Sequence, residues 1–121
     1  PYLPASSELR LFIVGDRVVA ALQKNHSNDD FRANMGRSGV DTKNYPVNSL
    51  DGTLSDQLVH TMSKTGALYG ACDLLYYAGN YYLLEINFVP GFEQMEQLTS
   101  CNIAKEILLC ALNQYRNLIV N

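Results

Sequence analysis

The sequence predicts an α+β domain in which an antiparallel sheet carries helices packed mainly on one face. Two stretches, 8–22 and 70–91, place strand-forming residues on both sides of a glycine-containing turn, a pattern typical of β-hairpins. Segments 53–65 and 103–120 repeat apolar residues at the spacing of an amphipathic helix. The resulting order of two strands, a short third strand, a helix, two strands and two helices favours an antiparallel sheet.

Length and charge limit the class of protein. A chain of 121 residues is enough for one domain, and 47% hydrophobic with 17% charged residues is typical of a globular protein. The net charge is −3 with only nine lysines and arginines, and the sequence has no basic run. Duplex nucleic acid is therefore excluded as the principal partner.

The sequence also favours a cytoplasmic location. It opens Pro-Tyr-Leu-Pro, without the charged start and apolar run of a signal peptide, and no stretch approaches the ~20 apolar residues of a membrane helix. Cys72, Cys101 and Cys110 are odd in number and lack metal-site spacing, so no disulfide framework is expected.

The first hairpin is expected from Glu8–Val14 and Arg17–Leu22, which flank a turn at Gly15-Asp16. Its apolar run 11–14 has no polar interruption and predicts a strand covered on both faces. Glu8 and Arg10 share one face at the solvent end of this strand. By residue type alone they form an exposed ion pair worth about 0–1 kcal/mol.

The segment after the first hairpin is polar. Residues 24–30 read as a loop, and Phe31–Met35 as a short strand with Arg32 and Asn34 on one face. The planar fork of an arginine matches phosphate oxygens, but by residue type alone Arg32 is better explained as a surface residue. Residues 41–52 contain two asparagines, a proline and a glycine and are expected to form a loop.

Three helices are expected in the rest of the chain: Thr53–Thr65, a short one over Phe92–Leu98, and Ile103 to about Val120 with Asn102 as its N-cap. The first is assigned to packing alone. The residues expected to face the core are Leu54, Leu58, Val59 and Met62 in the first helix, Phe92, Met95 and Leu98 in the second, and Ile103, Ile107, Cys110, Ala111 and Leu118 in the third.

The register of the second hairpin decides which polar residues meet. A two-residue loop at Gly79-Asn80 places Asp73 opposite Ile86, on the wrong face. A three-residue loop, Ala78-Gly79-Asn80, places Asp73 directly opposite Glu85.

Paired acids on one face suggest a metal site. Glu85 and Asn87 lie on the same side of their strand, and Asp73 joins them in the second register. Two opposed carboxylates repel each other unless a cation lies between them. Two carboxylates and an amide oxygen suit Mg²⁺ or Mn²⁺, with phosphate oxygens and waters completing the shell. The alternative is an ordinary half-solvated hairpin, which the spacing alone favours. Burial of either acid against a lysine or arginine would leave the site without its metal chemistry.

A resemblance to a known family favours the metal site over the ordinary hairpin. Asp73, the Glu85-Ile86-Asn87 run and Pro90-Gly91 together resemble the metal-binding hairpin of ATP-grasp enzymes, closest to the RimK-like ATP-dependent glutamate ligases and their amino-acid-ligase relatives. Further stretches resemble other segments of that family, in order along the chain: Glu8-Leu9-Arg10, Asp30 to Asn34, Gly36 to Gly39, and Asn102 to Ala104.

The resemblance implies the fold of an ATP-grasp C-terminal subdomain, with ATP and Mg²⁺ (or Mn²⁺) as cofactors. It puts Glu8 near the nucleotide, Arg10 beside the phosphates or substrate, and Arg32 and Asn34 on the phosphate side, with Arg32 also catalytic. It makes Asp73, Glu85 and Asn87 the metal ligands. Three departures from the family pattern weaken parts of this assignment: Glu8 in place of Asp, Ser38 in place of a glycine, and the bulky pair Phe88 and Val89 before Pro90.

The implied chemistry is ATP-dependent joining of a carboxylate to an amine through an acylphosphate, with an amino acid or peptide as substrate and glutamate as one candidate. Residues 1–121 are interpreted as one domain, the C-terminal part of a longer enzyme whose N-terminal subdomains are missing, so this chain alone is expected to bind Mg-ATP weakly and to catalyse nothing. Two alternatives stay open. One is a stand-alone non-catalytic module that associates, for example as a homo-oligomer, through its exposed sheet face. The other is a divalent-metal binder unrelated to ATP.

Overall fold

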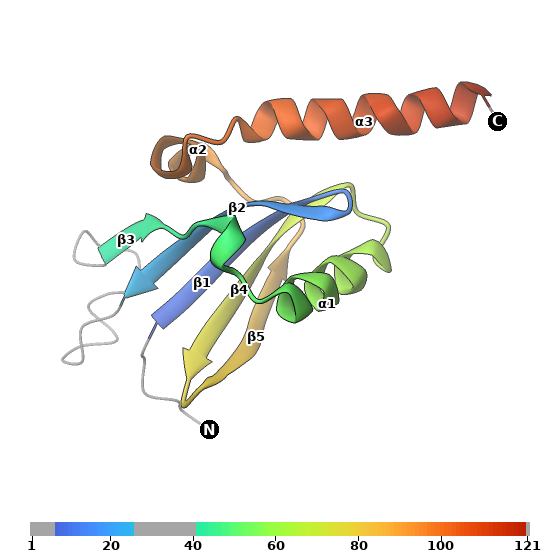
Figure 1. The fold of residues 1–121 in the computed structure, drawn as a ribbon. Helices are drawn as coiled ribbons and strands as arrows, with labels where there is room; N and C mark the ends of the chain where they lie inside the picture. Colours follow the sequence, from blue (N-terminus) through green and yellow to red (C-terminus); the bar gives the residue numbers. More distant parts are fainter. Residues whose placement is uncertain (1–6, 26–40, 121) are drawn as a thin grey trace.

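The computed structural model describes residues 7–25 and 41–120, which form one five-stranded antiparallel sheet with three α-helices (Figure 1). The α+β class and the antiparallel sheet agree with the sequence prediction. The strand order is β3-β2-β1-β4-β5, which makes β1 the central strand. The elements are β1 (Ser7–Val14), β2 (Arg17–Asn25), β3 (Asp41–Asn44), a 3₁₀ turn (Val47–Ser49), α1 (Gly52–Ser63), β4 (Tyr69–Tyr77), β5 (Asn80–Asn87), α2 (Glu93–Thr99) and α3 (Ile103–Val120).

Strand β1 is covered on both faces, as its unbroken apolar run predicts. Leu11, Phe12 and Ile13 are all 0% exposed, although consecutive side chains on a strand point to opposite faces. The core is therefore split into two clusters, one on each side of the sheet.

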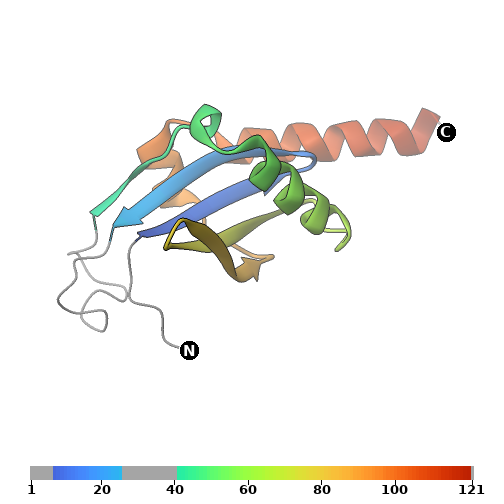
Figure 2. The ribbon, with the colours of Figure 1, turned by 60° about the horizontal axis from the view of Figure 1, so that its bottom comes forward.

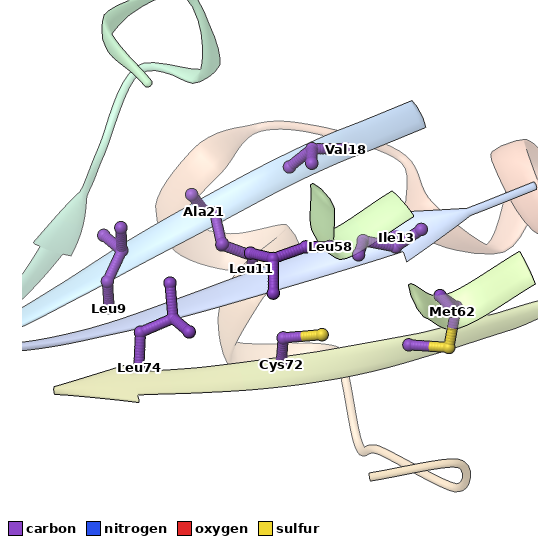
Figure 3. Close-up of a cluster of buried hydrophobic side chains, with 9 residues drawn as sticks. All are labelled: Leu9, Leu11, Ile13, Val18, Ala21, Leu58, Met62, Cys72 and Leu74. Atoms are coloured by element: carbon purple, nitrogen blue, oxygen red, sulfur yellow. The ribbon is translucent and has the colours of Figure 1, made fainter. Parts of the chain in front are cut away.

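The helices divide between these two faces, whereas the sequence predicted them mainly on one. The first cluster, shown in Figure 3, packs side chains of β1, β2 and β4 against Leu58 and Met62 of α1. The second cluster packs the other face of the same strands against Met95 of α2 and Ile103 of α3. Figure 2 shows α1 in front of the sheet and α3 behind it. A central strand that is apolar on both faces requires a covering layer on each.

Two strand boundaries differ from the prediction. Strand β2 continues past Leu22 to Asn25, and Asp41–Asn44 forms the edge strand β3 instead of a loop. Backbone pairing of Leu22 with Asn44 and of Asn25 with Asp41 holds β3 in place. Its sequence, Asp-Thr-Lys-Asn, has no apolar alternation, so only this pairing identifies it as a strand. The short strand predicted for Phe31–Met35 lies outside the described residues.

Helix boundaries agree closely with the prediction. Asn102 caps α3 as expected, because its Oδ1 accepts a hydrogen bond from the backbone N–H of Lys105 at 3.0 Å. The expected core faces are only partly right, since Leu98 is exposed and Leu118 is 80% exposed. Figures 1 and 2 show the reason for Leu118: α3 extends past the β1–β2 turn, and its C-terminal half has no strand beneath it. In the described ranges, no helix combines the length and apolarity needed to cross a membrane.

Cys72 is a core residue, as predicted. It lies in the first cluster at 0% exposure. Burial, and to a lesser degree the charge of neighbouring Asp73, raises the pKa of its thiol to about 11. The neutral thiol is therefore favoured, and thiolate forms only as the pH approaches that value, which makes Cys72 unsuited to nucleophilic chemistry.

The central position of Leu11 predicts a large cost for its truncation. Leu11→Ala removes a fully buried side chain from the first cluster and should lower the free energy of unfolding by about 2–5 kcal/mol. The matched control Leu108→Ala, at a 59% exposed site on α3, should change it by less than about 0.5 kcal/mol. Urea unfolding followed by circular dichroism measures both, and equal losses would contradict the assigned core.

Burial of Cys72 predicts selective thiol reactivity. At pH 8 the folded protein should expose Cys101 and Cys110 to Ellman's reagent, because both are partly accessible, while Cys72 stays unmodified. All three should react in denaturant. The control Cys72→Ala should give the same native count as the wild type, and a lower native count for Cys72→Ala would show that Cys72 is accessible.

Candidate functional site

The β4–β5 hairpin brings Asp73 and Glu85 directly opposite each other, as predicted, but by a different route. The loop has two residues, Ala78 and Gly79, with φ angles of 49° and 83°, which are typical of a type I′ turn. A β-bulge then follows: Leu74 pairs with Leu83 and Asp73 pairs with Glu85, leaving Leu84 as the extra residue. The bulge, and not a three-residue loop, sets the register of the two acids.

Asp73, Glu85 and Asn87 share one face of the sheet. Ile86 packs against the first core cluster, so its neighbours Glu85 and Asn87 point to the opposite face. Asn87 pairs with Ala71, two residues from Asp73 on the same side of β4. Its Oδ1 accepts a hydrogen bond from Val89 N–H at 2.9 Å, which fixes the turn after β5 and leaves that oxygen a second lone pair.

Arg10 binds Asp73 through two hydrogen bonds. The two residues face each other across β1 and β4, with Nε 2.7 Å from Oδ1 and Nη2 2.8 Å from Oδ2. Hydrogen bonding to Asp73 raises the pKa of Arg10 above its usual value, although burial opposes this shift. The negative charges of Glu85 and Glu8 also raise the pKa of Arg10. The guanidinium therefore lies in the field of three carboxylates.

This contact changes the interpretation of the opposed acids. The sequence predicted that a cation must lie beside Asp73 and Glu85, and among the described residues the guanidinium of Arg10 takes that role. Arg10 was expected beside phosphates or substrate, a role that stays a prediction, and in the structure its guanidinium binds Asp73. A carboxylate buried against an arginine would argue against a metal site, but this pair keeps 28% and 21% of its side-chain surface exposed. Solvent and ligands can therefore still reach it.

A small hollow of about 140 Å³ surrounds the pair. It is lined by Glu8, Arg10, Lys24, Asp73, Leu84 and Glu85. This volume is below the roughly 300–1,000 Å³ of sites that enclose a small molecule. Within the described ranges, no group of three or more His, Cys, Asp or Glu side chains is placed to hold a metal ion. The residues that line the hollow can therefore form only one wall of a binding site and only part of the coordination shell of a metal.

Lys24 and Leu84 are residues of this hollow that sequence reasoning missed. Lys24 was assigned to a polar loop, but it belongs to β2 and pairs with Glu8. Continuing the alternation of β2 beyond Leu22 would have put Lys24 on the same face as Glu8 and Arg10. Leu84 enters the hollow because of the bulge, which has no sequence signal of its own.

The remaining predicted site residues, Arg32 and Asn34, and the glycine-containing segment 36–39 lie outside the described residues. Their roles therefore stay predictions. A larger groove of about 700 Å³ lies at the opposite end of β1, between α1, the β1–β2 turn and α3. It contains none of the residues predicted for the site.

Comparison with known proteins identifies relatives over most of the chain. Residues 3–110 match the family described as the RimK-like ATP-grasp domain. A probable alpha-L-glutamate ligase of Pasteurella multocida is 30% identical over 112 residues, covering 93% of this chain and 34% of that protein. The chain therefore spans about a third of the length of the curated relatives that it matches.

Solved structures of ATP-grasp ligases share the fold. The macrocyclase MdnC from Microcystis aeruginosa, bound with the precursor peptide MdnA, superposes with a TM-score of 0.72 at 28% identity, covering 93% of this chain and 34% of that one. The ATP-grasp ligase PsnB, complexed with a phosphomimetic variant of its minimal precursor, Mg and ADP, has a TM-score of 0.68 at 24% identity, covering 91% and 33%. The second likeness concerns the fold alone.

Proposed function

The chain belongs to the RimK-like ATP-grasp family, and from this premise we propose that it is the C-terminal part of an ATP-dependent ligase that joins a carboxylate to an amine. The observation that carries the proposal is the common face of Asp73, Glu85 and Asn87 on two adjacent strands. In such a reaction ATP phosphorylates the carboxylate and leaves as ADP, and the amine then attacks the acylphosphate, loses a proton and releases phosphate.

The donor set fits a hard cation that is held together with phosphates. Two carboxylates and an amide oxygen provide part of a Mg²⁺ or Mn²⁺ shell and leave positions for phosphate oxygens and water. Arg10 and Lys24 line the same hollow and offer N–H donors to phosphate oxygens. Asp73, Glu85 and Asn87 would hold the metal, and Glu8, Arg32 and Asn34 keep the nucleotide-side roles that the family resemblance implies.

The substrate proposal follows the relatives. Curated relatives are named probable glutamate ligases, and MdnC was solved with a precursor peptide. We therefore assign an amino acid or a peptide as substrate, with glutamate as one candidate for the joined residue.

The chain supplies only one wall of the proposed site. A hollow of about 140 Å³ is too small to enclose a nucleotide, and the matched relatives are about three times longer. We assign the missing wall to N-terminal subdomains of a longer polypeptide. The 121-residue chain alone should therefore bind Mg-ATP weakly and synthesise no amide.

The alternative is a non-catalytic module that associates with other chains. It is favoured by the Arg10–Asp73 contact, which satisfies Asp73 without any metal, and by exposed apolar side chains on β5 and α3.

Calorimetric titration with ATP separates these functions. The 121-residue chain should release heat with ATP only when Mg²⁺ is present. Asp73→Asn and Glu85→Gln should weaken this binding by at least the roughly tenfold that loss of a supporting group costs at metal sites. Asp56→Asn removes an acid from α1, away from the hollow, and should leave binding unchanged.

Two other outcomes would contradict the ligase assignment, and a third would contradict the need for further subdomains. No heat with Mg-ATP in the wild type would favour the non-catalytic module. Heat with Mg²⁺ that ATP does not increase would favour a metal binder unrelated to ATP. Amide synthesis by the 121-residue chain would contradict the proposed need for further subdomains.

A further inference from the structure

The Arg10–Asp73 contact lies inside the proposed metal site. Resting on the proposed function, we infer that Arg10 is a positioning residue: it holds Asp73 in the absence of phosphates and so weakens the binding of a divalent cation on its own. When phosphates enter, Arg10 binds them and releases Asp73 to the metal. The affinity of this chain for a divalent metal then rises when a phosphate-bearing ligand is bound.

The geometry makes Arg10 a direct competitor of a cation at Asp73. Both carboxylate oxygens of Asp73 accept hydrogen bonds from the guanidinium, at 2.7 and 2.8 Å. These lengths are typical of a charge-assisted bidentate pair, which holds both partners in one orientation. A metal ion that approaches these oxygens meets a positive charge already bound to them.

The sheet enforces this competition. Arg10 belongs to the central strand β1, which pairs with β2 on one side and β4 on the other, and it lies directly opposite Asp73 in the β1–β4 register. The contact therefore follows from strand pairing between residues far apart in the chain. The exposed pair Arg17–Glu106 does not follow from strand pairing, because it joins the start of β2 to α3.

Phosphates remove the competition because they offer the guanidinium an equivalent partner. A phosphate presents oxygens that match the planar fork of arginine, so Arg10 can exchange one bidentate acceptor for another. The partial exposure of both side chains leaves room for the exchange. The freed carboxylate, Glu85 and the phosphate oxygens then form a joint set of ligands for the cation.

Lys24 provides a matched control. It lines the same hollow and carries the same charge, but it lies opposite Glu8 in the β1–β2 register. Among the described residues, the ion pair of Asp73 is with Arg10 and not with Lys24. Neutralising Lys24 changes the general charge of the hollow. Neutralising Arg10 also frees Asp73.

The test measures Mn²⁺ affinity by electron paramagnetic resonance in the 121-residue chain, with and without tripolyphosphate. Without it, Arg10→Gln should bind Mn²⁺ about tenfold more tightly than the wild type, the size of effect that one neighbouring charge has on the ionisation of a carboxylate. Lys24→Gln should give a clearly smaller gain. Arg10→Lys, which keeps the charge but not the fork, should fall between the wild type and Arg10→Gln. With tripolyphosphate, the advantage of Arg10→Gln should disappear.

The controls distinguish the inference from the proposed function. If Arg10→Gln gains no more Mn²⁺ affinity than Lys24→Gln while Asp73→Asn still abolishes Mn²⁺ binding, the role proposed for Arg10 is contradicted and the proposed metal site is retained. If Asp73→Asn binds Mn²⁺ and tripolyphosphate as the wild type does, the proposed metal site is wrong and the inference with it. Should Arg10→Gln fail to fold, Arg10→Lys decides, because an affinity equal to the wild type with and without tripolyphosphate would overturn the role of the fork.

Discussion

The bidentate contact between Arg10 and Asp73 stabilises a group of charged residues on the sheet face that α2 and α3 partly cover. On the same face of β1, Phe12 and Val14 are buried under α2 and α3, whereas Arg10 and Glu8 lie beyond these helices and line an open hollow. A row of charges on a sheet face is unfavourable unless neighbouring strands alternate their sign. Arg10 lies between Glu8 along its own strand and Asp73 across the sheet, and thereby allows an apolar core and a polar site to share one surface.

The surfaces around this hollow suit a partner that covers it. Strand β5 is an edge strand, and Leu84, which is 52% exposed, presents apolar surface beside the charged residues. Edge strands with exposed apolar side chains tend to associate. A further subdomain would bury this edge and close the hollow, and that closure would strengthen the electrostatic interactions within it because water is excluded. The same surfaces left uncovered would favour self-association of the isolated chain.

Local patterns in the sequence predicted most of the fold, whereas long-range register did not follow from them. Both hairpins, the three helices and the Asn102 cap have signals within a few residues and agree with the structure. The division of the helices between two faces was also implied by the apolar run 11–14, which predicts cover on both sides and conflicts with a single helical layer. The Arg10–Asp73 contact joins residues 63 positions apart, and it depends on the β1–β4 pairing, which neither hairpin determines. The β-bulge that aligns Asp73 with Glu85 has no local signal, and β3 is too polar to be read as a strand.

The β4–β5 register places two acids opposite each other, and the repulsion between them lowers stability. The rest of the fold does not require an acid at both positions. Stability alone would favour a neutral or basic residue opposite Asp73, because Arg10 already satisfies both oxygens of that carboxylate. Glu85 adds a second negative charge opposite Asp73, so the hollow is lined by three acids, Glu8, Asp73 and Glu85, but only two cations, Arg10 and Lys24. The excess negative charge is thus concentrated on the face that also carries the amide of Asn87, two residues further along β5. Sites that sacrifice stability in this way are typically functional, and this excess charge supports the proposed divalent cation, bound together with phosphates.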